Sequence, residues 1–312
     1  MDEFLSLLKD YLAQNEKLIQ FVSNLQGSEK EYYRENQEIL YVGIVNRTYS
    51  LWETFCKDIV FEYYKRIKNQ LLNRGELVQR LKLNELPGYI VEQGTIADNR
   101  ISYEITKEYI TYTSKNIGFE ELKTLFMRFD VKVEELKSNQ VIRDFLVDNG
   151  FYFDVEDFKN DYLKIAMKKL TDERNVVSHY SSIDEYKELT IIISWIKFYQ
   201  IIAQELTSLI IRNLIEETDT NPQKLGSFVK YFSDKHLLLI DVSTGVSADS
   251  ESIIYTKNNN EVKNVYKPIS FMVENNEVSS IKEDDKAGIM LNPIIEKNKS
   301  IIQNDEIYVI SV

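Results

Sequence analysis

The segment "RNVVSHY", residues 174–180, places three residue types of chemical interest within one and a half helical turns. His179 can transfer a proton near neutral pH, because the pKa of an imidazole lies in that range. Arg174 carries a planar, permanently charged guanidinium that can hold two oxygens of an anion at once. Asn175 has a side-chain amide that can both donate and accept hydrogen bonds. The segment is therefore a candidate catalytic site.

A structural interpretation of the same segment stays open. Arg174 can lie at the edge of a helix with its charged end in solvent. His179 can be a cation near a helix C-terminus, where it interacts favourably with the helix dipole. The spacing alone favours this interpretation, and only its surroundings favour catalysis.

The helix that carries the segment constrains its geometry. Apolar residues share one broad face of the pattern over 155–180, namely Val155, Phe158, Tyr162, Leu163, Ala166, Leu170 and Val177. Arg174 and His179 are five residues apart and point about 140° apart on an ideal helix. They converge only if the helix ends or distorts here, or if a second subunit supplies its own copy. This geometry favours a homodimer.

A capping signal follows the segment. "SIDE" has Ser182 in the N-cap position and Glu185 three residues later, which predicts a helix over about 183–216. That helix is apolar over more of its circumference than one bundle face needs, which suggests an added interface.

The rest of the chain divides near residue 220. Helical spacing dominates before it, with helices predicted over 2–25, 29–74, "FEELKTLFMRF", "VIRDFLVDNG" and 155–180, and an irregular insertion over 84–118. Short strand-like runs follow, "HLLLIDV", "SIIYTK", "NEVKNVY", "ISFMV", "AGIML" and "EIYVISV", with "NNN" and "ENNE" as turns. The prediction is an α+β protein with a helical domain, 1–218, and a small β-barrel or sandwich, 221–312.

The charge of the chain limits its partners. The formal net charge is −12, and residues 221–312 hold 10 lysines and no arginine against 13 acidic residues. A general nucleic-acid clamp is basic, so any RNA must be held by a local patch. The single cysteine, Cys56, lies in an apolar stretch and is predicted to be a buried thiol in a reducing compartment. The acidic N-terminus differs from a secretory signal and no run of eighteen apolar residues occurs, so we expect a cytoplasmic protein without a membrane partner.

The 174–180 segment resembles the Arg-x4-6-His signature of the HEPN superfamily, in which a polar residue commonly follows the arginine. Four residues separate Arg174 from His179, and Asn175 occupies the polar position. "NRTYSLWETF" and "SKNIGFEELKTLF" resemble segments of HEPN proteins from bacterial defence and toxin systems. The resemblance covers about 1–217. Some toxin members carry a tyrosine two residues after the histidine, whereas here Tyr180 follows His179 directly and residue 181 is a serine, so control through that tyrosine is not implied.

The resemblance implies a metal-independent endoribonuclease that leaves 2′,3′-cyclic phosphate and 5′-hydroxyl ends. Arg174, Asn175 and His179 would be catalytic, and Arg47, Glu53, Ser178 and Tyr180 are candidates to line the site. No cofactor and no metal are expected. The implied partners are RNA, a second copy of the chain and a regulatory or neutralising protein. The alternative is a non-catalytic HEPN adaptor or antitoxin that binds RNA or protein, which the acidic charge favours.

Two features of the C-terminal part complete the survey. "AGIML" with "IIQNDEIYVISV" is similar to the closing strands of small β-barrels in translation GTPases, although Asn304-Asp305 replaces Gly-Asp there. This similarity implies a module that touches tRNA, the ribosome or a protein. His236 is predicted to open a strand and to be structural, because a zinc site needs more ligands than it has nearby.

Overall fold

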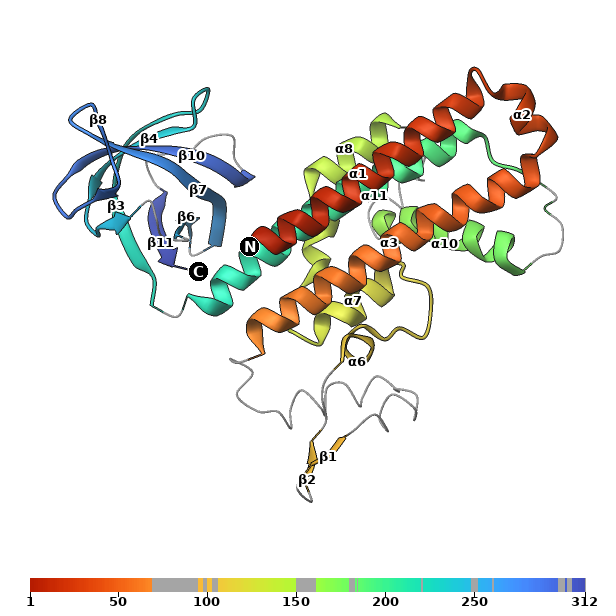
Figure 1. Cartoon of the computed structure of the whole chain (residues 1–312), viewed down its shortest axis with the longest axis horizontal. Coiled ribbons are helices and arrows are strands. Elements are labelled where there is room, and N and C mark those ends of the chain that lie inside the picture. The colour runs from red at the N-terminus through yellow and green to blue at the C-terminus, as the bar shows by residue number, and fades with distance from the viewer. Residues whose placement is uncertain are drawn as a thin grey trace. The chain divides into compact units, whose positions relative to one another are not determined.

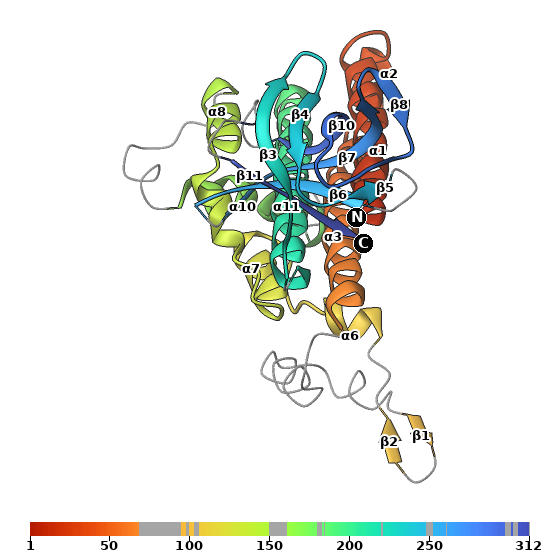
Figure 2. The same ribbon diagram turned by 90° about the vertical axis from the view of Figure 1, so that its left-hand side faces the viewer.

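The computed structural model contains two compact units, Asp2–Ile210 and Ile211–Val312 with Met1, and each is described by itself. The first unit is helical, and strands form most of the second (Figures 1 and 2). The α+β class predicted from the sequence is confirmed. The structure describes residues 1–68, 95–97, 100–102, 106–149, 161–179, 183, 185–219, 221–247, 252–259, 261–296, 301 and 305–311.

The first two long helices pack against each other. α1 (Asp2–Gln26) confirms the helix predicted over 2–25, and α3 (Gln37–Ile67) returns alongside it (Figure 1). The single helix predicted over 29–74 is wrong, because α2 (Lys30–Glu35) is separated from α3 at Asn36. The Asn36 side chain donates to the carbonyl of Tyr32 at 3.0 Å, and such competition for backbone groups interrupts helices. Residues 69–74 lie outside the described residues.

α3 is the central helix of the helical unit. Trp52 is fully buried, and its ring centroid lies 4.9 Å from that of Tyr199 on α11 (Leu189–Thr218). Cys56 is also fully buried, as predicted, and burial raises the pKa of its thiol. Burial of large aromatic rings supplies much of the stability of such a core.

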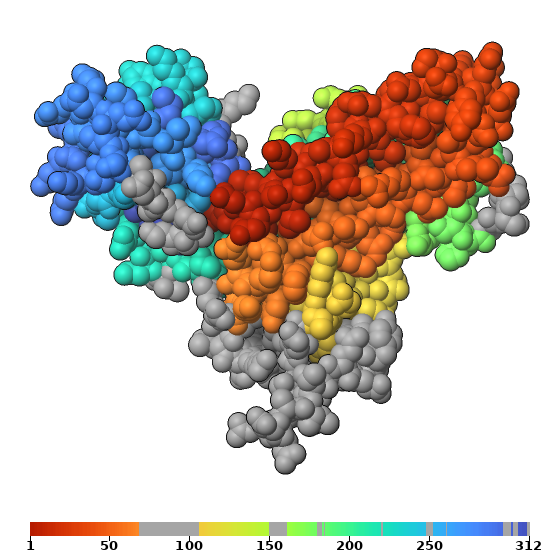
Figure 3. Space-filling view, in the orientation of Figure 1, coloured from red at the N-terminus to blue at the C-terminus, as the bar shows by residue number. Residues whose placement is uncertain are grey.

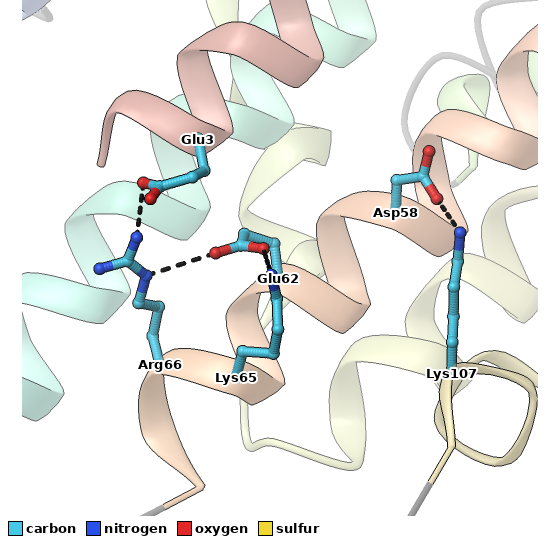
Figure 4. A network of polar contacts seen from close by, with 6 residues as sticks. All are labelled: Glu3, Asp58, Glu62, Lys65, Arg66 and Lys107. Carbon is cyan, nitrogen blue, oxygen red and sulfur yellow. Dashed lines mark hydrogen bonds and ion pairs between the residues drawn. The ribbon is translucent and has the colours of Figure 1, made fainter.

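Ion pairs join the C-terminal part of α3 to its neighbours (Figure 4). Arg66 contacts Glu3 of α1 at 2.5 Å and Glu62 at 3.3 Å. Asp58 pairs with Lys107 of α6 (Lys107–Thr111). All of these cations are partly exposed, so each pair is worth at most about 1 kcal/mol. In Figure 3, α1 and α3 form much of the face turned to the viewer.

Short elements connect α3 to the helix of interest. The insertion predicted over 84–118 contains the paired strands β1 (Thr95–Ala97) and β2 (Arg100–Ser102), followed by α6, and its remaining parts before residue 106 lie outside the described residues. Next come α7 (Phe119–Met127), the 3-10 helix η1 (Val133–Ser138) and α8 (Gln140–Asp148). The helices predicted from "FEELKTLFMRF" and "VIRDFLVDNG" are thereby confirmed.

α10 (Tyr162–His179) carries the candidate segment and packs on α3. Of its predicted apolar face, Tyr162, Leu163, Ala166, Leu170 and Val177 are buried, whereas Val155 and Phe158 lie outside the described residues.

The start of the last helix differs from the prediction. Residues 185–188 are not helical, and α11 begins at Leu189 rather than near 183, so Glu185 does not close a capping box. The Tyr41 hydroxyl accepts the backbone N–H of Lys187 at 3.2 Å, and the carbonyl of Glu188 accepts the first helical N–H groups instead. Ser182 lies outside the described residues. A long-range contact thus overrides a local capping signal.

The apolar circumference of α11 is used inside the protein. Its buried residues include Ile192, Trp195, Phe198, Tyr199 and Ile202. Among the large apolar side chains of this helix, that of Ile191 is exposed, at 41%. The added interface suggested by this helix is therefore not needed to explain its composition. No described helix is both long enough and apolar enough to cross a membrane.

The second unit contains a closed β-barrel. Six strands form an antiparallel ring in the order β10-β4-β3-β11-β6-β7, and a pairing of β10 with β7 closes it. The barrel alternative of the prediction is confirmed. The six strands are β3 (Gln223–Phe232), β4 (Leu237–Val242), β6 (Ser252–Asn258), β7 (Glu261–Val273), β10 (Lys286–Glu296) and β11 (Glu306–Ser311).

Short strands lie outside this ring. β8 (Asn276–Val278) pairs with β7, and β5 (Val246–Ser247) pairs with β9 (Ser280–Ile281). Glu274 and Asn275, from the predicted turn "ENNE", adopt φ of 50° and 66° between β7 and β8. Such left-handed pairs are typical of tight hairpins and favour asparagine.

Three details of the strand prediction need correction. "NEVKNVY" and "ISFMV" form one strand, β7, in which Pro268 lies beside a register shift that accommodates its missing N–H. β3 was not predicted, because its alternation is weak and few of its residues are fully buried. His236 does not open β4 but lies in the preceding turn with φ 46°, where its Nδ1 is 2.9 Å from the Tyr231 hydroxyl.

Candidate functional site

Arg174 lies at the edge of the face that α10 turns toward α3. Its guanidinium carbon is 5.2 Å from the centroid of the Tyr49 ring, and the side chain is half-buried. No carboxylate of the described residues lies within ion-pair distance of it. A guanidinium stacked on a ring keeps its in-plane N–H groups free to donate. Within the described residues, Arg174 is therefore a positioned cation without a carboxylate partner.

Tyr49 supports Arg174 from α3. Its hydroxyl accepts the backbone N–H of Ile117 at 2.8 Å. Burial and the nearby Glu53 carboxylate raise the pKa of Tyr49, against smaller opposing effects of the Ile117 hydrogen bond and of Arg174. The ring is consequently neutral at physiological pH and presents an uncharged face to the guanidinium.

Asn175 is exposed and is held from a different part of the chain. The Asn116 Nδ2 donates to Asn175 Oδ1 at 2.6 Å, and Arg174 Nη1 lies 3.5 Å from the same oxygen. Asn116 belongs to the loop between α6 and α7, within the quoted segment "SKNIGFEELKTLF". The site thus combines α10, α3 and this loop.

The loop that carries Asn116 is anchored at both ends. The carbonyl of Ile117 accepts Trp52 Nε1 at 2.8 Å, and its N–H is bound by Tyr49. At the other end, the buried Arg128 guanidinium donates to the carbonyls of Ile110 and Tyr112. Burial lowers the pKa of Arg128 to about 10, so it stays charged at neutral pH. Buried donors of this kind fix a backbone that would otherwise be free to move.

His179 is the last residue of α10 and is exposed. Because α10 is regular up to this residue, Arg174 and His179 point about 140° apart and do not meet within one chain. The imidazole has no hydrogen-bond partner among the described residues. Ser178 Oγ donates to Asn46 Oδ1 of α3 at 3.2 Å and so ties the end of α10 to α3. Tyr180 lies outside the described residues.

The two candidate residues on α3 lie in different surroundings. Arg47 Nη2 donates to Gln14 Oε1 of α1 at 2.6 Å, so its described contact is with α1 and not with α10. Glu53 pairs with Lys57 at 2.6 Å, one turn away, and its charge acts on Tyr49. Of the two, Glu53 is the residue near Tyr49, the ring that contacts Arg174.

Sequence reasoning missed Tyr49, Asn116 and Asn46. Tyr49 and Asn46 stand on the same stripe of α3 as Glu53, so helical spacing from Glu53 was a signal that pointed to them. Asn116 is 59 residues from Asn175, and no local pattern indicates that contact. Among the described residues, no group of three or more His, Cys, Asp or Glu side chains is arranged to hold a metal ion.

Comparison with known families agrees with this architecture. Residues 9–212 match the family model described as RiboL-PSP-HEPN. The chain therefore belongs to the RiboL-PSP-HEPN family, which connects it with RNA cleavage or RNA binding. No curated protein and no solved structure matches it significantly.

Proposed function

We propose that the protein is a metal-independent endoribonuclease whose site contains Arg174, Asn175 and His179. The observation that supports this most directly is the Arg174 guanidinium, stacked on Tyr49 without a carboxylate partner among the described residues. A guanidinium that is held against a ring, with its N–H groups not engaged by a described carboxylate, can donate them to an anionic ligand. An uncompensated, preorganised cation suits the charge that develops on a phosphoryl group.

The reaction we propose is attack of the ribose 2′-hydroxyl on the adjacent phosphorus. The P–O bond to the next nucleotide breaks, leaving a 2′,3′-cyclic phosphate and a 5′-hydroxyl. Arg174 would stabilise the phosphoryl oxygens, Asn175 would donate to one of them, and His179 would transfer a proton. No metal enters this scheme.

A homodimer completes the proposed site. Since Arg174 and His179 point away from each other on one regular helix, a second copy is needed to bring an imidazole beside the guanidinium. We propose that two copies of 174–179 face each other, each supplying Arg174 to one half and His179 to the other. This argument rests on helix geometry and not on the apolar surface of α11.

The setting we propose is a bacterial defence or toxin system in the cytoplasm, with a neutralising or regulatory protein partner. Its basis is the likeness of "NRTYSLWETF" and "SKNIGFEELKTLF" to segments of such HEPN proteins. For the β-barrel we propose targeting or control.

A second candidate function is RNA or protein binding without cleavage. The net charge of −12 favours this adaptor role over a nuclease, and a protein partner over RNA, because RNA binding relies on positive charge. The two are separated by incubating the purified protein with RNA in EDTA and analysing the product ends. The nuclease should cut and leave cyclic phosphates, and it should spare DNA and 2′-O-methyl RNA. His179→Ala controls for contaminating nucleases. Cleavage that strictly requires magnesium would exclude the mechanism.

A further inference from the structure

The Asn175 side chain is oriented by its surroundings. Two donors, Asn116 Nδ2 at 2.6 Å and Arg174 Nη1 at 3.5 Å, are directed at its Oδ1. Because a carboxamide is planar, fixing the oxygen also fixes the NH2 group on the opposite side. That NH2 has no acceptor among the described residues and is exposed. It is therefore free to donate to an anion.

Asn116 is the stronger of the two constraints. An exposed asparagine amide rotates easily, and a turn of 180° would present its oxygen, an acceptor, where a phosphate oxygen must bind. The contact with Asn116 disfavours that orientation, because it would bring the NH2 groups of the two amides, both of them donors, face to face. Arg174 alone, at 3.5 Å, exerts a weak hold.

Asn116 can act this way because its backbone is fixed by the core. Tyr49 and Trp52, three residues apart on α3, bind the N–H and the carbonyl of the next residue, Ile117. The same Tyr49 ring stacks on Arg174. One buried residue pair thus sets the position of the loop relative to the guanidinium.

We infer that Asn116 is a positioning residue of the site, which holds the Asn175 amide with its NH2 toward the scissile phosphate. The inference rests on the proposed function, since it assigns Asn116 to the same RNA site. The ligand group is a phosphodiester oxygen of the RNA backbone, contacted by Asn175 and not by Asn116 itself.

A double-mutant cycle tests whether Asn116 acts through Asn175. Asn116→Ala should lower the cleavage rate about tenfold in the wild-type background, as expected for loss of one hydrogen bond to a charge-binding group. In an Asn175→Ala background the same change should have no further effect, since there is no amide left to orient. Asn149→Ala is the matched control, because it also removes one exposed amide hydrogen bond, to Phe145, at the end of α8. It should cleave like the wild type.

Two further measurements keep the outcomes distinct. The affinity for 2′-O-methyl RNA is measured for the four proteins of the cycle, namely the wild type, the two single variants and the double variant. The Asn175 side-chain amide signals are followed by NMR in Asn116→Ala and in the control Asn149→Ala. A shift of those signals in Asn116→Ala alone supports the inference. Wild-type cleavage by Asn116→Ala, or an undiminished effect in the Asn175→Ala background, overturns it.

If the wild type binds RNA without cutting it, only the nuclease proposal fails, and the cycle is read from the affinities. If it neither cuts nor binds RNA, the proposed function fails. An Asn175 signal that Asn116→Ala leaves unmoved would then overturn the positioning itself.

Discussion

The Tyr41 hydroxyl donates a hydrogen bond to the carboxylate of Glu173 at 2.6 Å, deep between α3 and α10. Both side chains are buried, and Glu173 directly precedes Arg174. The same hydroxyl accepts the N–H of Lys187, just before α11. One phenol therefore joins both sides of the segment that carries the candidate site.

Tyr41→Phe should destabilise the helical unit by about 2 kcal/mol, because it leaves a buried carboxylate and a backbone N–H without this partner. Urea unfolding followed by circular dichroism measures the change. Tyr32→Phe, at a residue that is 52% exposed, is the control and should change stability little. A Tyr41→Phe protein as stable as the wild type would mean that water replaces the hydroxyl.

Alkaline pH should unfold the helical unit. Burial raises the pKa of Tyr11, Tyr41, Tyr49 and Tyr199 above the ordinary value of 10.0. Above that pH the unfolded chain releases protons that the folded chain retains, so the unfolding free energy falls as pH rises. Each such tyrosine contributes about 1.4 kcal/mol per pH unit until its folded pKa is reached.

The measurement is the urea midpoint at a series of pH values from 8 upward, roughly spanning the ordinary tyrosine pKa. Stability should be level below about pH 10 and decline beyond it. In Tyr41→Phe the unfolding free energy should fall less steeply with pH, by the contribution of one tyrosine, about 1.4 kcal/mol per pH unit. An equal slope in both proteins would contradict the assignment for Tyr41.

Arg174→Lys and His179→Ala should both fold and both lose cleavage. Lysine keeps the charge but loses the planar fork and its stacking on Tyr49. Loss of the proton-transfer group should slow cleavage roughly a hundredfold or more. Melting temperatures should stay near the wild-type value, since both side chains lie at the edge or end of α10. Full activity in either variant would return the segment to a structural role.

Mixing Arg174→Ala with His179→Ala should restore activity if the site is shared between subunits. In a mixed dimer one composite site keeps both residues, so random exchange should recover about a quarter of the wild-type rate. The rate is followed after the two inactive proteins are unfolded and refolded together. If no cleavage activity is recovered in samples that are dimers by size measurement, Arg174 and His179 act in the site of a single subunit.

Two glycines should respond oppositely to alanine. A Cβ on Gly226 would lie 2.3 Å from the backbone oxygen of Asp241 in β4, so Gly226→Ala should destabilise the barrel by more than about 2 kcal/mol. A Cβ on Gly43 meets nothing within 4 Å, and Gly43 is inside α3, so Gly43→Ala should add about 0.5–1 kcal/mol. Denaturant midpoints check both. A tolerated Gly226→Ala would mean that β3 and β4 separate easily.

Much of this molecule could be predicted from local patterns. The helices α1, α7 and α10 and most barrel strands follow from periodicity, because their apolar faces repeat along the chain. Arg174, Asn175 and His179 lie close together in the sequence, within residues 174–179, so they could be found as a group. The α+β class followed from the change in period near residue 220.

The rest depends on contacts between distant residues. The predicted start of α11 was wrong, because the start is set by the hydrogen bond between Lys187 and Tyr41, which lies 146 positions earlier in the sequence. Asn116 and Tyr49 join Asn175 and Arg174 only when α3, α10 and the loop have packed. β7 was predicted as two strands because Pro268 indicates a break, whereas a register shift beside Pro268, where β7 has one extra residue opposite β10, accommodates the proline. No pattern along the chain contains these facts.

Closure of the barrel by the β10–β7 pairing limits how other molecules can use it. A sheet with open edges can recruit an extended peptide by adding it as a further strand. Within the described residues the ring has both neighbours of each strand occupied, and the appended β8 is three residues long. Backbone pairing with a partner is thereby limited to stretches that extend past a neighbouring strand, such as residues 227–232 of β3 on the side of β11, and side chains or loops must supply the rest of any recognition.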